Sequence, residues 1–276
     1  MRRAVRLALG AMAAALGVLA VPAVAAPARV VSINLCTDQL AMLLAAPGQL
    51  VSVSRLASDP LSSSMADEAA AYPANRGSAE QVYLMHPDLV LAGEYTDHAT
   101  VDLLRRLGVQ VVQVPIVNAL DEVPGQLRLV AAALGREAEG EALVARYERD
   151  LAALTLDVPE LAGALYYPNG YTTGGGTVAD DVLTRAGFFN VAVDAGVTGG
   201  GILPLENLVL AHPRLVVTSR PYPGASRSED ILRHPALAAL GAEARVVAAN
   251  DADWLCGTPH ILRALAAMRE LRLALQ

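Results

Sequence analysis

One phrase occurs twice in this chain, and that duplication restricts the possible folds more than any other feature. Residues 80–90 read EQVYLMHPDLV, and residues 206–216 read ENLVLAHPRLV. Each copy places a glutamate six residues before a His-Pro pair, and a Leu-Val pair that opens a strand pattern follows. The same helix-to-strand unit stands once in each half, which predicts two lobes of similar construction.

Short β-branched runs alternate with helical patterns along the rest of the chain. RVVSIN at 29–34 and RLVVTS at 214–219 are two of the predicted strands. Such alternation is typical of parallel sheets flanked by helices. An Ala-rich segment between the halves predicts a helix over about 136–155. We therefore predict an α/β fold with two Rossmann-like lobes, each around a parallel central sheet, joined by a single long linking α-helix.

The predicted boundaries follow from this pattern. Residues 27–134 form the N-terminal lobe, residues 135–157 the linking helix, and residues 158–276 the C-terminal lobe. Two segments are less regular: NVAV at 190–193 predicts a weak strand, and TTGGGT at 172–177 predicts a flexible turn into a helix that begins near Thr177. The glycine run lacks the lysine of a phosphate-binding loop.

The first 25 residues have the pattern of an export signal. Arg2, Arg3 and Arg6 precede a short apolar core that ends in small residues, and cleavage is expected after Ala25. The general and the twin-arginine export routes both stay open. The chain carries a net charge of −7, and removal of three signal arginines with no acidic residue gives −10. We expect a soluble periplasmic protein that binds neither nucleic acid nor an anionic membrane surface.

Three His-Pro pairs occur in the sequence, at His86, His212 and His234. A histidine interacts favourably with the C-terminal end of a helix dipole, and the proline stops the helix. We interpret all three as helix ends. Glu80 and Glu206 open the helices of the duplicated phrase, where an acidic residue is favoured by the dipole. Their equivalent placement also suits a partner with paired arginines.

The whole chain after the signal resembles the substrate-binding proteins of cobalamin- and iron-siderophore-type ABC transporters. The resemblance rests on HPDLVLAG at 86–93, on RVVSINLCTDQLAMLLAAPGQLVSVS at 29–54, on YYPNGYTTGGGTVADDVLTRAGFFN at 166–190, and on ANDADWLCGTPHILRALAAMREL at 249–271. It implies two similar lobes on a rigid linking helix, with the ligand held between them. It also implies no catalytic activity and no cofactor.

The resemblance assigns a role to the duplicated phrase. In this family each lobe carries a glutamate that docks on arginines of one permease subunit. Glu80 and Glu206 match those glutamates in motif and spacing. The implied partners are a permease dimer with its ATPase subunits, and the binding protein itself is expected to be a monomer.

Ligands of open α/β sheets bind beyond the carboxyl ends of the strands. In the two lobes those ends carry flat aromatic, polar and cationic side chains suited to a large amphipathic ligand. The predicted ligand-binding residues are Asn34, Cys36, Thr37, Arg55, Tyr95, Tyr167, Tyr171, Arg220, Tyr222, Trp254 and Cys256. The expected ligand is a metal chelate. A ferric siderophore ranks slightly ahead of cobalamin because Arg55 and Arg220 suit an anion, and haem is a further candidate.

Two other functions have partial support in the residues. A Cys-His hydrolase would use Cys36 or Cys256 with His260, but no complete triad can be assigned. A transition-metal or haem-binding protein would use Cys36, Cys256, His98 and His260, although their spacing forms no metal-binding cluster. Catalysis is therefore not expected, and a metal role for these four residues is the alternative function.

The only two cysteines, Cys36 and Cys256, follow the first and the last predicted strand. Both are expected to face the cleft between the lobes. An even cysteine count in an exported protein favours a disulfide, whereas a bond here would pin the lobes together across the ligand site. Both states stay open, and we narrowly favour two free thiols that touch the ligand or its metal.

Overall fold

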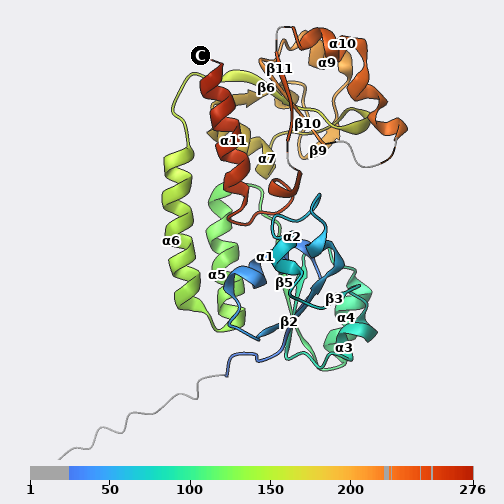
Figure 1. The fold of residues 1–276 in the computed structure, drawn as a ribbon, viewed down its shortest axis with the longest axis vertical. Helices are drawn as coiled ribbons and strands as arrows, with labels where there is room; N and C mark the ends of the chain where they lie inside the picture. The colour runs from blue at the N-terminus through green and yellow to red at the C-terminus, as the bar shows by residue number, and fades with distance from the viewer. Residues whose placement is uncertain (1–24, 221–223, 225, 243, 250, 276) are drawn as a thin grey trace, which may run out of the picture.

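The computed structural model describes residues 25–275 apart from 221–223, 225, 243 and 250. The predicted signal peptide therefore lies almost wholly outside the described residues. Two parallel sheets form two lobes, drawn one above the other in Figure 1, with helices along one side. This arrangement confirms the predicted fold class. Within the described part of the chain, no helix is long and apolar enough to span a membrane.

The first lobe is built on a five-stranded sheet in the order β3-β2-β1-β4-β5, and every neighbouring pair is parallel. The strands are β1 (Val30–Ser32), β2 (Leu50–Ser54), β3 (Ala74–Asn75), β4 (Leu89–Gly93) and β5 (Gln110–Val114). The helices are α1 (Leu35–Leu44), η1 (Arg55–Ser58), α2 (Ala66–Ala69), α3 (Ala79–Tyr83), α4 (His98–Arg106), η2 (Leu120–Glu122) and α5 (Val123–Leu134). The first copy of the repeat therefore supplies α3 and the start of β4.

The second lobe has a four-stranded parallel sheet in the order β11-β10-β6-β8 and a small antiparallel pair, β7 and β9. The strands are β6 (Leu161–Leu165), β7 (Tyr171–Thr173), β8 (Phe188–Asn190), β9 (Gly200–Ile202), β10 (Leu215–Thr218) and β11 (Arg245–Ala248). The helices are η3 (Pro168–Gly170), α7 (Val178–Arg185), α8 (Val191–Asp194), α9 (Leu205–Leu210), η4 (Arg227–Arg233), α10 (Pro235–Leu240), η5 (Asp251–Asp253) and α11 (Ile261–Ala274). The second copy of the repeat supplies α9 and the start of β10.

The chain passes from one sheet to the other through α5 and α6 (Glu137–Leu154). α6 agrees with the helix predicted over about 136–155. Gly135 adopts φ +67°, a left-handed conformation that ends α5 and reverses the chain. Gly140 lies against Ala131 so closely that a Cβ at position 140 would clash with the alanine side chain. The two helices therefore pack tightly, and α11 stands beside them in Figure 1.

The buried apolar residues fall into three clusters. The largest is continuous from the first lobe, through α5, α6 and α11, into the second lobe, and we call it the shared core; it includes Leu40, Leu127, Tyr147, Phe188 and Leu265. The other two clusters are private to one lobe each. One packs α3 and α4 on the first sheet, and the other packs α8, α9 and α10 on the second. The lobes are thus joined by apolar packing as well as by the chain.

Two local predictions were wrong, the strand at 190–193 and the flexible glycine turn. Residues 191–193 form the start of α8 rather than a strand, because the Asn190 side chain accepts from the N–H of Ala192 and caps a helix there. The strand lies just before it, as β8. His234 lies between two helices. Its N–H donates to the carbonyl of Ile231 and closes η4, as predicted, while its Nδ1 accepts from the N–H of Ala236, so it also caps α10, which Pro235 begins.

The glycine run at 174–176 is not a free turn. Gly175 forms a bridge to Thr198, and the N–H of Gly174 donates to the carbonyl of Gly199 at 2.7 Å. A Cβ at position 174 would clash with the carbonyl of Val197. The predicted start of the next helix is confirmed, because Thr177 caps α7 by accepting from the N–H of Asp180.

Candidate functional site

A disulfide joins the two lobes at the carboxyl ends of their sheets. Cys36 lies in the first turn of α1, directly after β1, and Cys256 lies in the segment between β11 and α11. The two residues are bonded across a sequence separation of 220, with their Cα atoms 5.2 Å apart. The prediction of two free thiols is therefore wrong. The fold brings the two segments into direct contact, which leaves no ligand space between the sulfur atoms.

Hydrogen bonds fasten the same segment of the second lobe to the first lobe. The Thr258 hydroxyl donates to Oε1 of Gln39 at 3.1 Å, and both side chains are buried. The Ser64 hydroxyl donates to Oδ1 of Asp253 at 2.9 Å, and the Arg263 guanidinium donates to the carbonyl of Ser64 at 3.3 Å. The disulfide is therefore one of several contacts that this segment makes with the first lobe.

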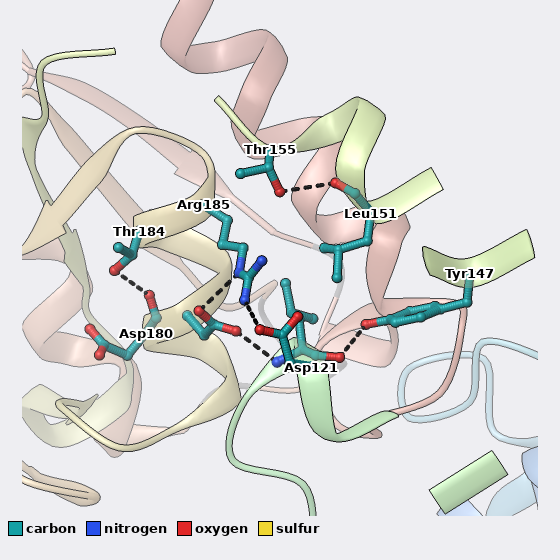
Figure 2. Close-up of polar contacts among 9 residues, drawn as sticks. Asp121, Tyr147, Leu151, Thr155, Asp180, Thr184 and Arg185 are labelled. Atoms are coloured by element: carbon teal, nitrogen blue, oxygen red, sulfur yellow. Dashed lines mark hydrogen bonds and ion pairs between the residues drawn. The ribbon is translucent and has the colours of Figure 1, made fainter. Parts of the chain in front are cut away.

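A second group of polar contacts between the lobes lies beside α6, as Figure 2 shows. Arg185 of α7 pairs with Asp121 of η2 at 2.5 Å and with Asp181 at 3.2 Å. Asp181 also accepts from the N–H of Leu120 at 2.7 Å, and the Tyr147 hydroxyl donates to the Leu120 carbonyl at 2.9 Å. This group was not predicted. The spacing of Asp181 and Arg185 was a visible signal, but their partners on η2 depend on the fold.

A cavity of about 120 Å³ lies where the two lobes meet. It is lined from the first lobe by residues that include Asn34, Cys36 and Tyr95, and from the second lobe by Val178, Leu255 and Gly257. Pockets for drug-sized ligands are typically about 300–1,000 Å³. The cavity therefore has room for one edge of a chelate rather than for the whole molecule.

Gln126 of α5 supplies a polar group to this cavity. The residue is 6% exposed, and its Nε2 donates to the carbonyl of Pro115 at 2.6 Å. Its Oε1 is buried and accepts no hydrogen bond from the described residues. A buried acceptor without a donor is costly, at about 1–3 kcal/mol. Gln126 was not predicted, and it can accept from a hydroxyl or amide of a ligand.

A second, larger hollow of about 490 Å³ lies on the second lobe beside β11 and α11. Arg220 and Trp254 line it, together with Arg245 and Arg263. The predicted ligand residues are therefore divided between this hollow and the cavity where the lobes meet. Trp254 lines the larger hollow, whereas Leu255, the next residue, lines the cavity where the lobes meet.

Two predicted residues of the first lobe have structural roles at the start of α1. The Asn34 side chain accepts from the N–H groups of Cys36 and Thr37 and caps the helix. Thr37 is 1% exposed, and its hydroxyl lies 2.7 Å from that of Ser32. Both residues also line the cavity, although the Thr37 side chain is almost fully buried.

The remaining predicted residues differ in exposure. Arg55 is exposed at the start of η1, and Tyr95, just beyond β4, is 79% exposed. Tyr167 is half-buried, and its ring centroid lies 6.3 Å from that of Tyr171, which is 44% exposed. Tyr222 lies outside the described residues. Among the described aromatic residues of the predicted set, Tyr95 and Tyr171 are thus the exposed ones.

The alternative metal site does not form. Both sulfur atoms of Cys36 and Cys256 are consumed by the disulfide. His98 begins α4 and is exposed, while His260 lies just before α11, where burial lowers its pKa. Across the described ranges, no three His, Cys, Asp or Glu residues are grouped so that they could hold a metal ion.

Asp38 is a buried carboxyl two residues beyond the disulfide. It is 0% exposed, and it accepts from the N–H of Ser54 at 3.0 Å and from the Ser54 hydroxyl at 2.5 Å. Burial raises the pKa of Asp38 to about 6 despite these hydrogen bonds. The bonds tie α1 to the end of β2, so Asp38 holds the strand end from which Arg55 projects.

Comparison with known proteins identifies the class. The model of the periplasmic binding protein family matches residues 30–247, and the chain belongs to this family. The family is one of binding proteins, which confirms the prediction of a non-catalytic protein. It also agrees with the resemblance seen in the sequence.

Individual relatives are similar over part or all of the chain. The chain is 29% identical over 198 residues to a protein named cobalamin-binding protein from Halobacterium salinarum, covering 70% of this chain and 54% of that protein. It is 29% identical over 154 residues to an uncharacterized ABC transporter substrate-binding lipoprotein, YvrC, from Bacillus subtilis, covering 51% and 48%. The chain thus spans about half the length of the curated relatives it matches.

Among solved structures, the fold is similar to that of the periplasmic heme-binding protein RhuT from Roseiflexus sp. RS-1 in its apo form. The TM-score is 0.72 at 25% identity, and the match covers 90% of this chain and 97% of that one.

The disulfide leads to a first prediction. Replacement of both cysteines (Cys36→Ser with Cys256→Ser) should lower the free energy of unfolding by roughly 3–5 kcal/mol, because the bond closes a loop of more than two hundred residues in the unfolded chain. Urea unfolding with and without reductant measures this. Reduced wild type should behave like the double variant. Two free thiols in denatured, unreduced wild type would contradict the bond.

Asp38 leads to a second prediction. A carboxyl whose pKa is raised on folding costs stability above its folded pKa, and this cost is relieved as the pH falls through about 6. Asp38→Asn should therefore raise the free energy of unfolding at pH 8 by about 1–2 kcal/mol, since one pKa unit corresponds to about 1.4 kcal/mol. The gain should shrink by pH 4.5. Exposed Asp67→Asn is the control, and a gain that grows toward low pH would contradict the argument.

Proposed function

We propose that this protein is the extracytoplasmic solute-binding component of an ABC importer, which holds a metal chelate between its lobes and delivers it to a permease. The observation that carries the proposal is the meeting of the two sheets. Segments that follow the carboxyl ends of β1 and β11 are bonded together, so the ligand-binding edges of both sheets border one region. The family match and the ABC transporter relative support the same function.

A chelate suits the site better than a bare metal ion. The accessible groups are tyrosine rings, two arginines and amide side chains, which can contact the organic part of a ligand by packing and hydrogen bonds. A ferric siderophore remains our first candidate, because exposed Arg55 and Arg220 suit an anionic chelate. Cobalamin is the second candidate, favoured by the cobalamin-binding relative. Haem is the third, favoured by the structural similarity to a heme-binding protein.

Permease docking through Glu80 and Glu206 belongs to this proposal. Both side chains are exposed, each in the first turn of a short helix of the duplicated phrase. A two-fold symmetric permease would meet one carboxylate from each lobe. Residues 1–25 would direct export to the periplasm.

Titration of the mature protein with a ferric siderophore, cobalamin and haem tests the ligand. We expect one of them to bind with a Kd of about 1 μM or tighter. Tyr95→Ala should weaken that binding about three- to tenfold through lost packing. Tyr83→Ala, on α3, is the matched control and should change nothing. Arg55→Ala should weaken the siderophore more than cobalamin. Failure of all three chelates to bind would refute the proposed ligand class.

Charge reversal tests docking. The double variant Glu80→Arg with Glu206→Arg should abolish uptake of the bound chelate, while its affinity for the purified protein stays unchanged. Each single variant should transport at an intermediate rate. Glu148→Arg is the control, because Glu148 is an exposed glutamate of α6 that lies outside the repeat and does not line the cavity. Normal uptake by the double variant would show that these carboxylates do not dock.

A further inference from the structure

Each copy of the duplicated phrase exposes a leucine one helical turn beyond its glutamate. Leu84 follows Glu80 by four residues and is 72% exposed, and Leu210 follows Glu206 by four residues and is 74% exposed. Residues four apart lie on the same face of a helix. In the first copy the relation is direct, because the N–H of Leu84 donates to the carbonyl of Glu80 at 3.2 Å.

The local structure around the two leucines is the same. The inward position of each helix is fully buried, with Val82 in the private core of the first lobe and Leu208 in that of the second. His86 and His212 both adopt a left-handed conformation, with φ of 51° and 44°. Positive φ is uncommon for residues other than glycine. Both copies therefore end the helix by the same turn and hold the leucine outward in the same way.

Apolar surface continues beside each leucine. In the first lobe Tyr83 is 40% exposed next to Leu84. In the second lobe a groove of about 470 Å³ borders Leu210 and is lined mainly by apolar groups of α9 and α10, with Glu206 at its edge. Neither Glu80 nor Glu206 forms an ion pair within the part of the chain that the structure describes.

A single exposed leucine on a surface needs no explanation. Two leucines at the same place in an internal repeat, each one turn from an unpaired carboxylate, form a pattern that chance exposure does not produce. A partner for this pattern must present two equal sites, and each site must combine a cationic group with an apolar hollow.

Charge decides between the possible partners. An anionic lipid surface would repel both carboxylates and the net charge of −7. A second copy of this chain, docked through the same patch, would set glutamate against glutamate. A permease dimer that presents arginines satisfies the charge and the duplication together.

We propose that Leu84 and Leu210 are apolar anchors that insert into the two subunits of the permease beside the docking glutamates. This inference rests on the proposed function. Each lobe then presents a two-part contact in which the carboxylate sets orientation and the leucine contributes burial. Anchors of this kind account for much of the affinity at protein interfaces, whereas charges at the rim mainly guide association.

Uptake of the chelate identified by titration tests the anchors in the source organism, with the native gene replaced by variants. Leu84→Ser with Leu210→Ser should reduce uptake at least tenfold, while chelate affinity and Tm of the purified protein stay unchanged. Each single variant should lie between. Leu129→Ser is the matched control, because Leu129 is also exposed, at 38%, but lies on α5.

A photo-crosslinking residue placed at position 84, or at 210, identifies the partner independently. Crosslinks to the permease support the proposal. Crosslinks to a second copy of this chain, or to lipid alone, overturn it. Normal uptake by the double leucine variant, combined with loss of uptake on charge reversal at Glu80 and Glu206, overturns the anchors and leaves docking intact. Normal uptake by both double variants refutes docking itself.

Discussion

The fixed relation between the two lobes is the constraint on which the rest of this structure depends. The shared core runs through α5, α6 and α11 from one sheet to the other, so a large change in the angle between the lobes would expose buried apolar surface. The disulfide between Cys36 and Cys256 adds a covalent link between the lobes. Arg185 with Asp121, and Ser64 with Asp253, add polar contacts between the lobes. Together these contacts oppose a change in the angle between the two lobes.

This rigidity bears on how a chelate would be bound. A site whose walls are already in place loses less conformational entropy on binding than one that must close around its ligand. The cavity between the lobes holds only about 120 Å³, so most of a chelate would rest against the exposed rim of Tyr95 and its neighbours. Inside the cavity, Gln126 offers a buried acceptor for a polar group of the ligand, because its Oε1 has no partner among the described residues. Recognition would then combine one inserted edge with a flat aromatic surface.

The fixed arrangement of the lobes also fixes the distance between the two copies of the duplicated phrase. The proposed docking points, Glu80 and Glu206, would meet a symmetric partner together only if the distance between them is fixed, and the shared core and the disulfide oppose changes in that distance. The helix of each repeat copy packs in the private cluster of its lobe, whereas Leu89 and Leu215 of the following strands belong to the shared core. The identical left-handed turn at His86 and His212 keeps the two helix ends alike although the flanking residues differ, as Asp88 and Arg214 do.

Local patterns in the sequence were sufficient for the parallel sheets, the linking helix and the duplicated helix-to-strand unit, because strand and helix periodicity are properties of neighbouring residues. They failed where a short polar side chain chose between two local structures, as Asn190 did in starting α8. Only the tertiary structure decided the pairing of Cys36 with Cys256 and the division of the predicted ligand residues between two hollows. The distance between residues 220 positions apart depends on how two lobes pack, and that packing is a sum of many small contacts that no single segment of sequence contains.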